Sequence, residues 1–284
     1  MSPQGPAILY VVATPIGNLE DMTFRAVRIL KEVTWIACED TRQTQKLLHH
    51  YGIATSTVSY HEHNEMERAK ELVARLLQGS SGALVSDAGM PLVSDPGYRL
   101  VRAAVEAGVS VQALPGASAS LTALAASGLP TDQFHFAGFL PVKSGQRLQC
   151  LQSIKNEAAT TIFYEAPHRI LDALTDIETA LGNRPVVVAR ELTKLHEEYL
   201  RGTASDIRAQ LASRDAIRGE FTVLIGKATR ADVDATPLDR AVESCIQSGM
   251  SRMEAMKLVA RQRGISKRDV YRTVEIQAKS GRVT

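Results

Sequence analysis

The sequence predicts an α/β protein with two α/β domains, a ligand cleft between them, and a small C-terminal helical segment. In residues 1–132, short apolar runs alternate with helical patterns, which is typical of a mostly parallel sheet covered by helices on both faces. In residues 133–228, hairpin-like and crossover links both occur, so a mixed sheet is expected. Residues 237–284 carry three helical patterns and are expected to form a basic helical tail.

The first domain is expected to contain five strands, each an apolar run closed by small or polar residues. These runs are 8–12, 35–38, 57–60, 83–85 and 109–114. Helices are expected between them. In the first helix, Phe24, Val27, Leu30 and Val33 recur at helical spacing, which predicts that they form its apolar face.

Two further helices are predicted to begin at capping residues. Asn64 and Glu67 have the spacing of a capping box. Asp95 is the expected N-cap of the next helix, because Pro96 suits a first helical position. A helix of small residues, 119–127, completes the domain.

The second domain begins with a change of composition. Aromatic residues followed by Pro141 in residues 133–144 indicate a link between the domains. The strands expected after it are 160–164, 186–189, 197–202 and 220–225. The tail helices are expected at 238–247, 251–262 and 266–276, with Ser251 and Ser266 as caps of the last two.

The composition is that of a globular protein in a reducing compartment. Of 284 residues, 44% are hydrophobic and 23% are charged. The longest early apolar run, 7–13, is too short to span a membrane, and no basic residue precedes it as in a secretory signal. The cysteines at 38, 150 and 245 are too scattered for a disulfide framework. We therefore expect a cytoplasmic protein without a membrane partner.

The charge is distributed unevenly along the chain. Residues 237–284 carry 10 Lys and Arg against 5 Asp and Glu, whereas the rest of the chain carries 23 against 26. This asymmetry indicates a polyanion contact by the tail. An ordinary solvated helical face would have the same composition.

The stretch 82–97 is the centre of the predicted site. Its apolar run ends at Asp87, and ligands of open α/β sheets bind beyond the carboxyl ends of the strands. Ala88 and Gly89 are small enough for a ligand to approach the backbone. The alternative is that Asp87 and Asp95 only cap turns and helices. Similar small or polar residues close other expected strands, at Pro15, Ser118, Tyr164, Glu165 and Glu191.

Several common motifs are absent. No two glycines have the spacing G-x-G, which excludes the dinucleotide-binding fingerprint. Phe221 stands where a P-loop before Gly226 and Lys227 would need its first glycine. The segment 61–63, His-Glu-His, has no third ligand in register, so we expect a solvated loop and no metal.

Seven blocks of the sequence together resemble the tetrapyrrole methylase superfamily, in particular its branch that acts on ribosomal RNA. In chain order the blocks are ATPIGNLEDMTFRAV, CEDTRQT, LVSDAGMPLVSDPG, LPGASAS, FYEAPHR, VVARELTKLHEE and GEFTVLIG. The resemblance implies a homodimer with S-adenosylmethionine bound between the two α/β domains. It further implies 2′-O-methylation of a cytidine in the decoding region of 16S ribosomal RNA, with the small ribosomal subunit rather than DNA as partner.

Matching these blocks assigns roles to individual residues. The cofactor contacts implied by the resemblance are Pro15, Asp87, Ala88, Gly89, Val93, Ser118, Ala119, Tyr164, Leu192 and Thr222. Glu165 and His168 are the candidate bases for the ribose hydroxyl, because they follow a strand next to the expected cleft. The alternative is that Glu165 is structural and pairs with Arg169. The residues expected to contact RNA are Arg42, Arg252, Arg261, Arg263, Lys267, Arg268 and Arg272.

Two other functions remain open at this point. An enzyme of the same fold can methylate a small tetrapyrrole-like substrate, although the basic tail argues against it. A non-catalytic RNA-binding module would also keep the fold and the basic tail. Binding of S-adenosylmethionine distinguishes the enzymes from the module.

Overall fold

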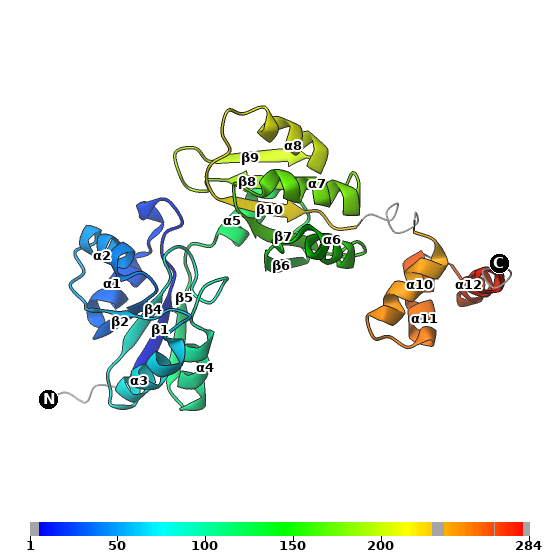
Figure 1. Ribbon diagram of the computed structural model, residues 1–284. Helices are drawn as coiled ribbons and strands as arrows, with labels where there is room; N and C mark the ends of the chain where they lie inside the picture. The colour runs from blue at the N-terminus through cyan, green and yellow to red at the C-terminus, as the bar shows by residue number, and fades with distance from the viewer. Residues whose placement is uncertain (1–5, 229–235, 264, 281–284) are drawn as a thin grey trace.

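The computed structural model describes residues 6–228, 236–263 and 265–280. Two five-stranded sheets with their helices are followed by a group of three helices (Figure 1). The two α/β sheets agree with the predicted fold class. Within the described residues, no helix is both long enough and apolar enough to cross a membrane.

The first sheet has the strand order β3-β2-β4-β1-β5, and every neighbouring pair is parallel. Its elements are β1 Ile8–Val12, η1 Leu19–Asp21, α1 Phe24–Glu32, β2 Trp35–Cys38, α2 Thr41–His50, β3 Thr57–Ser59, α3 Glu65–Leu77, β4 Gly82–Val85, α4 Tyr98–Glu106 and β5 Ser110–Leu114. Successive strand side chains point to opposite faces. Val12 and Ile36 thus pack in the core beneath α1 and α2, while Leu9 and Leu84 pack beneath α3 and α4.

The apolar face of α1 differs from the predicted one. Phe24 is 98% exposed, and the buried residues of the helix are Ala26, Ile29 and Leu30. Thr23 caps the helix by accepting a hydrogen bond from the Ala26 N–H. The spacing predicted the helix correctly but placed Phe24 on the wrong face.

Asn64 is the N-cap residue of α3, as predicted, but the capping box does not form, and the predicted start of α4 at Asp95 and Pro96 is wrong. The Asn64 side chain makes no cap bond to α3; it accepts from the His61 N–H and donates to the Ser59 carbonyl. Helix α4 begins only at Tyr98, with Gly97 as N-cap, so Asp95 and Pro96 lie in the preceding loop.

The second sheet is mixed, as predicted, with the order β6-β7-β10-β8-β9. Only the β6–β7 pair is parallel. Its elements are α5 Ala119–Ser127, β6 Phe134–Phe139, α6 Ser144–Ser153, β7 Thr160–Glu165, α7 Ile170–Leu181, β8 Val186–Arg190, β9 Glu198–Gly202, α8 Ala204–Ala212 and β10 Phe221–Ile225. Residues 133–144 are therefore more than a link, because they contain the edge strand β6.

Helices cover both faces of the second sheet. Buried residues of α6, α7 and α8 form one core with alternate residues of β7, β8 and β10. Helix α5, which the sequence places in the first domain, packs against the other face through Ala123 and Leu124. The chain therefore passes from the first sheet to the second in the loop between β5 and α5, and this loop borders the site.

The tail forms a three-helix group of its own. Its helices are α10 Leu238–Gln247, α11 Arg252–Arg263 and α12 Lys267–Ser280. Val242, Val259 and Val270 are buried between them. The hydroxyls of Ser251 and Ser266 accept from the N–H groups of Glu254 and Asp269, as expected of N-caps.

Candidate functional site

A cavity of about 410 Å³ lies between the two sheets. The loops after β1, β4 and β5 form its first-domain wall, and β6, β7 and β10 with their flanking residues form the opposite wall. It is lined by Ile16, Ala88, Gly89, Met90, Val93, Ser94, Asp95, Ser118, Ala119, Phe139, Tyr164, Glu165, Ala166, Pro167, Glu220, Phe221 and Thr222. The strand-end location is the one expected for a ligand of an open α/β sheet.

The turn after β4 is held against the loop after β1 by reciprocal hydrogen bonds. The Thr14 and Gly89 N–H groups each donate to the other residue's carbonyl, at 2.9 and 3.0 Å. The Ser86 hydroxyl also donates to the Gly89 carbonyl, at 2.9 Å. Gly89 has φ +81°, and an added Cβ would lie 3.3 Å from Ile16 Cγ2. Glycine thus suits this position for both conformation and space.

The loop after β1 also contacts the second domain directly. The Asn18 N–H donates to Thr193 Oγ1 at 3.1 Å. An added Cβ on Gly17 would lie 2.4 Å from Lys194 Cγ and 3.0 Å from the Leu192 carbonyl. The two domains are therefore closely apposed at this end of the cavity.

The structure brings most of the predicted cofactor residues together. Those that line the cavity are Ala88, Gly89, Val93, Ser118, Ala119, Tyr164 and Thr222. Pro15 and Asp87 line an adjoining cavity of about 430 Å³, which shares Ala88 and Glu220 with the first. Leu192 lines neither; it is buried in the apolar cluster that contains Ile16.

Asp87 faces the start of α2. Its Oδ1 accepts from the Asp40 N–H at 3.3 Å, and Asp40 in turn caps α2 by accepting from the Arg42 N–H at 2.9 Å. The carboxylate therefore fixes the loop between β2 and α2 as well as bordering the second cavity.

Tyr164 stands in an aromatic wall on the second-domain side. Its ring meets Phe136 and Phe139 edge-on, with centroid distances of 4.9 and 5.6 Å. Burial raises the pKa of its hydroxyl, and the negative charge of Asp95 adds to the shift. Tyr164 is thus a neutral hydrogen-bonding group at neutral pH.

The two candidate bases in the second domain occupy different environments. The Glu165 side chain is 0% exposed and forms an ion pair with Arg169 at 2.5 Å. Its Oε1 also accepts from the Ala166 N–H at 2.7 Å, whereas Oε2 is buried without a hydrogen-bond partner. His168 is exposed and does not line the cavity. The structure thus gives Glu165 an anchoring contact and leaves His168 outside the cavity.

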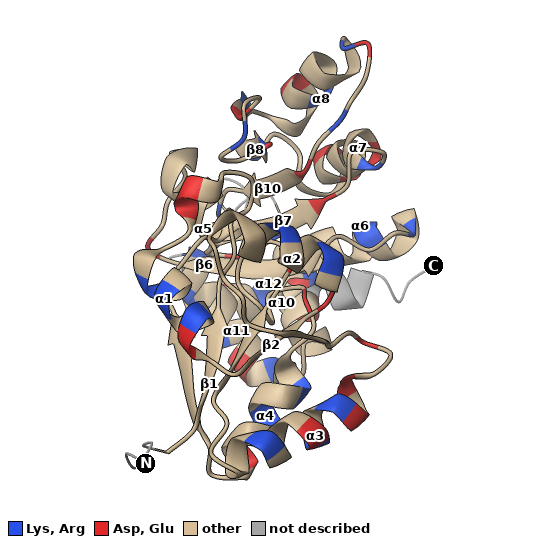
Figure 2. Ribbon diagram, turned by 90° about the vertical axis from the view of Figure 1, so that its left-hand side faces the viewer, with Lys and Arg blue, Asp and Glu red and all other residues tan. Residues whose placement is uncertain are grey.

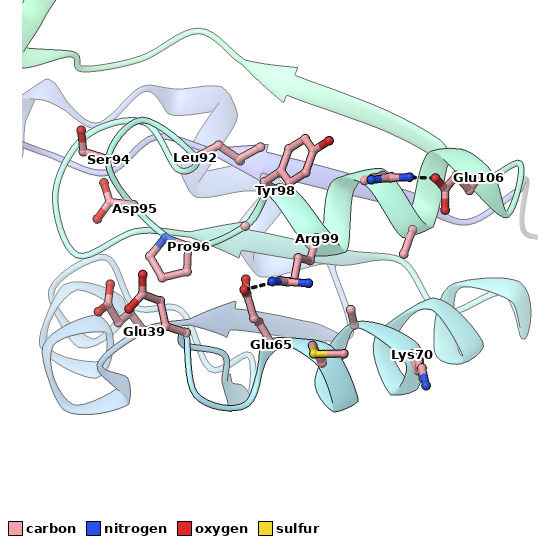
Figure 3. Close-up of a pocket in the computed structure, with 16 residues that line it drawn as sticks. Glu39, Glu65, Lys70, Leu92, Ser94, Asp95, Pro96, Tyr98, Arg99 and Glu106 are labelled. Carbon is pink, nitrogen blue, oxygen red and sulfur yellow. Dashed lines mark hydrogen bonds and ion pairs between the residues drawn. The ribbon is translucent and has the colours of Figure 1, made fainter. Parts of the chain in front are cut away.

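Carboxylates gather on the first-domain side of the cavity. Burial and the charges of Glu39 and Asp87 raise the pKa of Asp95 to about 6. Burial, followed by the charge of Asp87, also raises the pKa of Glu39. Glu39 and Asp95 lie near one another at the loop ends of the first sheet (Figure 3).

A groove of about 930 Å³ leads from these carboxylates along α3 and α4. Ser94 and Asp95 line both the groove and the interdomain cavity. Farther along, Arg99 pairs with Glu65 at 2.5 Å (Figure 3). Basic and acidic residues are interspersed along α3, so this face is not uniformly basic (Figure 2).

Some of the predicted RNA-contacting residues are exposed, and others are half-buried and contact neighbouring residues. Arg42 is 86% exposed at its side chain and pairs with Asp40 at 3.2 Å. In the tail, the exposed residues are Arg252, Arg261, Arg268 and Arg272. Lys267 and Arg263 are half-buried, with Lys267 Nζ 2.9 Å from Met253 Sδ and Arg263 donating to the Thr236 carbonyl. Across the described part of the chain, no three His, Cys, Asp or Glu side chains are grouped as metal ligands.

Sequence reasoning missed several cavity residues. Ile16, Met90, Phe139 and Phe221 line it without having been predicted. Each is apolar, so nothing in its residue type distinguishes it from a core residue. For Ile16, Met90 and Phe221, the neighbouring predicted residues Pro15, Gly89 and Thr222 were the available signal; Phe139 had no such neighbour.

A family model described as Tetrapyrrole (Corrin/Porphyrin) Methylases matches residues 8–208. The chain belongs to the tetrapyrrole methylase family. Among solved structures, this tetrapyrrole methylase resembles a diphthine synthase with a TM-score of 0.61, at 15% identity over 80% of this chain and 94% of that one. A cobalt precorrin-4 methyltransferase aligns with a TM-score of 0.55, at 16% identity over 80% and 97%. These likenesses concern the fold.

Similarity over nearly the whole tetrapyrrole methylase chain comes from sequence relatives. A protein of Halalkalibacterium halodurans is 52% identical over 93% of this chain and 93% of its own length. One of Synechocystis sp. is 47% identical over 95% and 99%, and one of Bacillus subtilis is 45% identical over 95% and 94%. All three are named "Ribosomal RNA small subunit methyltransferase I".

Proposed function

We propose that this chain transfers a methyl group from S-adenosylmethionine to the ribose 2′-hydroxyl of a cytidine in the decoding region of 16S ribosomal RNA. The observation that carries the proposal is the 45–52% identity to relatives named for ribosomal RNA methylation, over 93–95% of the chain. The cavity between the domains supports it, because its lining suits a ligand that is partly apolar and partly charged.

The cavity residues fit S-adenosylmethionine in chemistry. Ile16, Val93 and Phe221 offer apolar surface for an adenosyl group. At Ser118 the first turn of α5 has no side-chain cap, so its N–H groups are suited to a carboxylate. Gly89 allows close approach to the backbone. When bound, the cofactor would supply an electrophilic methyl group on a sulfonium.

The protein's own contribution is alignment. Positioning alone can lower the activation barrier of well-oriented reactants by about 7–11 kcal/mol. The close contact of the 15–18 loop with residues 191–194 fixes the distance between the two walls, and the aromatic wall around Tyr164 covers one side of the cavity with apolar surface.

The tail and Arg42 would hold the RNA through its phosphates. Arg252, Arg261, Arg268 and Arg272 are exposed on a three-helix group whose core is packed independently. Phosphate contacts release counterions, so affinity should fall steeply with salt. We also expect a cytoplasmic protein that forms a homodimer. Light scattering on the purified protein measures the molar mass and so tests the dimer.

The decisive experiment uses methyl-labelled S-adenosylmethionine with three acceptors: purified small ribosomal subunits, naked 16S RNA and a porphyrinoid. We expect label in the RNA at a single cytidine whose 3′ phosphodiester resists alkaline cleavage. Label in the porphyrinoid alone would support the tetrapyrrole alternative. No binding of the cofactor in calorimetry would support a non-catalytic RNA-binding module.

A second experiment tests the tail. Glutamine replaces Arg252, Arg261, Arg268 and Arg272 together, and we expect weaker RNA binding and a salt slope smaller by roughly 1 for each lost contact. The control replaces Arg28 and Arg102, which are exposed on α1 and α4 and pair with Glu32 and Glu106. An unchanged slope in the tail variant would make the tail a packing element.

A further inference from the structure

We propose that Asp95 is the residue that accepts the proton of the attacking ribose hydroxyl. This inference rests on the proposed function and assigns the base within the same site. The loop between β4 and α4 carries Asp95, and this residue lines both the interdomain cavity and the groove along α3 and α4. A substrate that enters from the groove meets the cofactor cavity at this side chain.

Asp95 differs from the other carboxylates of the cavity in its hydrogen bonds and ion pairs. Within the described residues, it has no hydrogen bond or ion pair. Glu165 is bound to Arg169 at 2.5 Å, and Glu220 pairs with Lys194 at 3.1 Å. Asp87, in the adjoining cavity, accepts the Asp40 N–H. A base must be able to exchange its partner for the substrate hydroxyl, and Asp95 alone among these four is uncommitted.

The groups that face Asp95 give it a basicity suited to neutral pH. Glu39 approaches from the end of β2, Asp87 from the end of β4 and Tyr164 from β7. The two carboxylates and burial raise the pKa of Asp95 to about 6. At pH 7 the group is mostly ionised yet more basic than an ordinary aspartate, which favours proton transfer from a hydroxyl.

The loop that carries Asp95 has a fixed and costly conformation. Leu92 and Ser94 have φ of 72° and 65°, which non-glycine residues seldom adopt. Gly97 has φ 142°, and an added Cβ would lie 2.8 Å from Leu84 Cδ2. Strain of this kind persists where surrounding contacts enforce it, and it is common at functional sites.

The proposed step balances as follows. The hydroxyl O–H bond breaks and its proton passes to the Asp95 carboxylate, giving a neutral carboxylic acid. The hydroxyl oxygen forms a bond to the methyl carbon. The sulfonium sulfur keeps the electron pair of the broken C–S bond, and Asp95 later releases the proton to water.

The test compares Asp95→Asn with Asp95→Glu and with a matched control, Asp132→Asn, whose carboxylate is 65% exposed and pairs with Lys227. Single-turnover methylation of small subunits is measured from pH 5 to 8.5. We expect the parent rate to rise through about pH 6. Asp95→Asn should be about 10²–10⁴-fold slower, and its rate should not rise through this pH range. Asp95→Glu should recover part of the rise in rate with pH, and the control should match the parent in rate at every pH.

Two further readouts separate a base from a merely structural residue. Calorimetry should show S-adenosylmethionine bound by Asp95→Asn within threefold of the parent. Carboxyl ¹³C NMR of the cofactor-free protein should show Asp95 titrating near pH 6, and Glu39→Gln should lower that value.

The possible failures are distinguishable. A parent active on RNA together with Asp95→Asn within threefold of it would overturn only the role of Asp95. The role of Asp95 would also be overturned if Asp95→Asn were slow but kept the parent's rise in rate near pH 6, or if its cofactor affinity fell in proportion to its rate. A parent that does not methylate RNA would overturn the proposed function and this role with it.

Discussion

The two walls of the interdomain cavity are built in different ways. The second-domain wall consists largely of strands β7 and β10, and its carboxylate, Glu165, is buried and bound to Arg169. The first-domain wall consists of loops, and its carboxylate, Asp95, has no partner within the described residues. We infer that the strand wall provides stability and shape, while the loop wall provides reactivity.

The largest expected effect concerns the strand wall. Arg169→Ala would leave the Glu165 carboxylate buried without a cation, and loss of one partner of a buried pair typically costs about 3–5 kcal/mol. Urea unfolding measures this loss. Arg28→Ala, which removes an ion pair with 58% and 55% exposed side chains, is the control and should cost about 0–1 kcal/mol. Equal losses in the two variants would contradict the contrast between the walls.

An intermediate effect is expected from the backbone of the loop wall. Gly89→Ala places a side chain at φ +81° next to Ile16, so we expect about 1–2 kcal/mol of lost stability and roughly tenfold weaker cofactor binding. Gly79→Ala has a similar φ of +91° but nothing within 4 Å of the added Cβ. It should lose similar stability and keep its cofactor affinity. Weakened binding in both variants would show that general strain, and not the cavity wall, is responsible.

The smallest effect concerns the charge of Asp95. Because the folded pKa of about 6 exceeds the ordinary 3.8, the folded state binds the proton more tightly. The free energy of unfolding should therefore fall as pH rises from about 4 to 6. Asp95→Asn should remove this decline and be about 1 kcal/mol more stable than the parent at pH 7, after allowance for solvent screening.

Unfolding curves at pH 4, 5, 6 and 7 check this expectation against Asp132→Asn. That control should follow the parent at every pH, because its carboxylate is largely exposed. If Asp95→Asn were less stable than the parent at pH 7, the carboxylate would have a stabilising partner and the contrast with Glu165 would be lost.

The sequence predicted the first sheet well because its strands β2 and β4 are buried on both faces. Continuous apolar runs such as Trp35–Cys38 have no other plausible location, and the residues at their ends mark the ligand edge. Seven of the ten predicted cofactor residues consequently line one cavity. The edge strand Phe134–Phe139 escaped prediction because its exposed aromatic residues lack the pattern of a buried strand.

The errors lie where tertiary contacts override local preference. Asp95 and Pro96 have the residue types of a helix start, but they follow two positive-φ residues, Leu92 and Ser94, and α4 begins only after Gly97. Glu165 was a plausible base by its position after a strand. Pairing with Arg169 was the alternative, and the structure shows that ion pair. The full burial of Glu165 depends on how the start of α7 packs, which residue spacing does not report.

The close contact between Gly17 and Lys194 bears on how far apart the two domains lie. A side chain at position 17 would require Lys194 or the Leu192 carbonyl to shift, so glycine is what allows the 15–18 loop and residues 191–194 to keep their present contact. Neither Gly17 nor Lys194 lines the interdomain cavity, so a larger residue at position 17 is expected to change the separation of its walls without altering any residue that lines it.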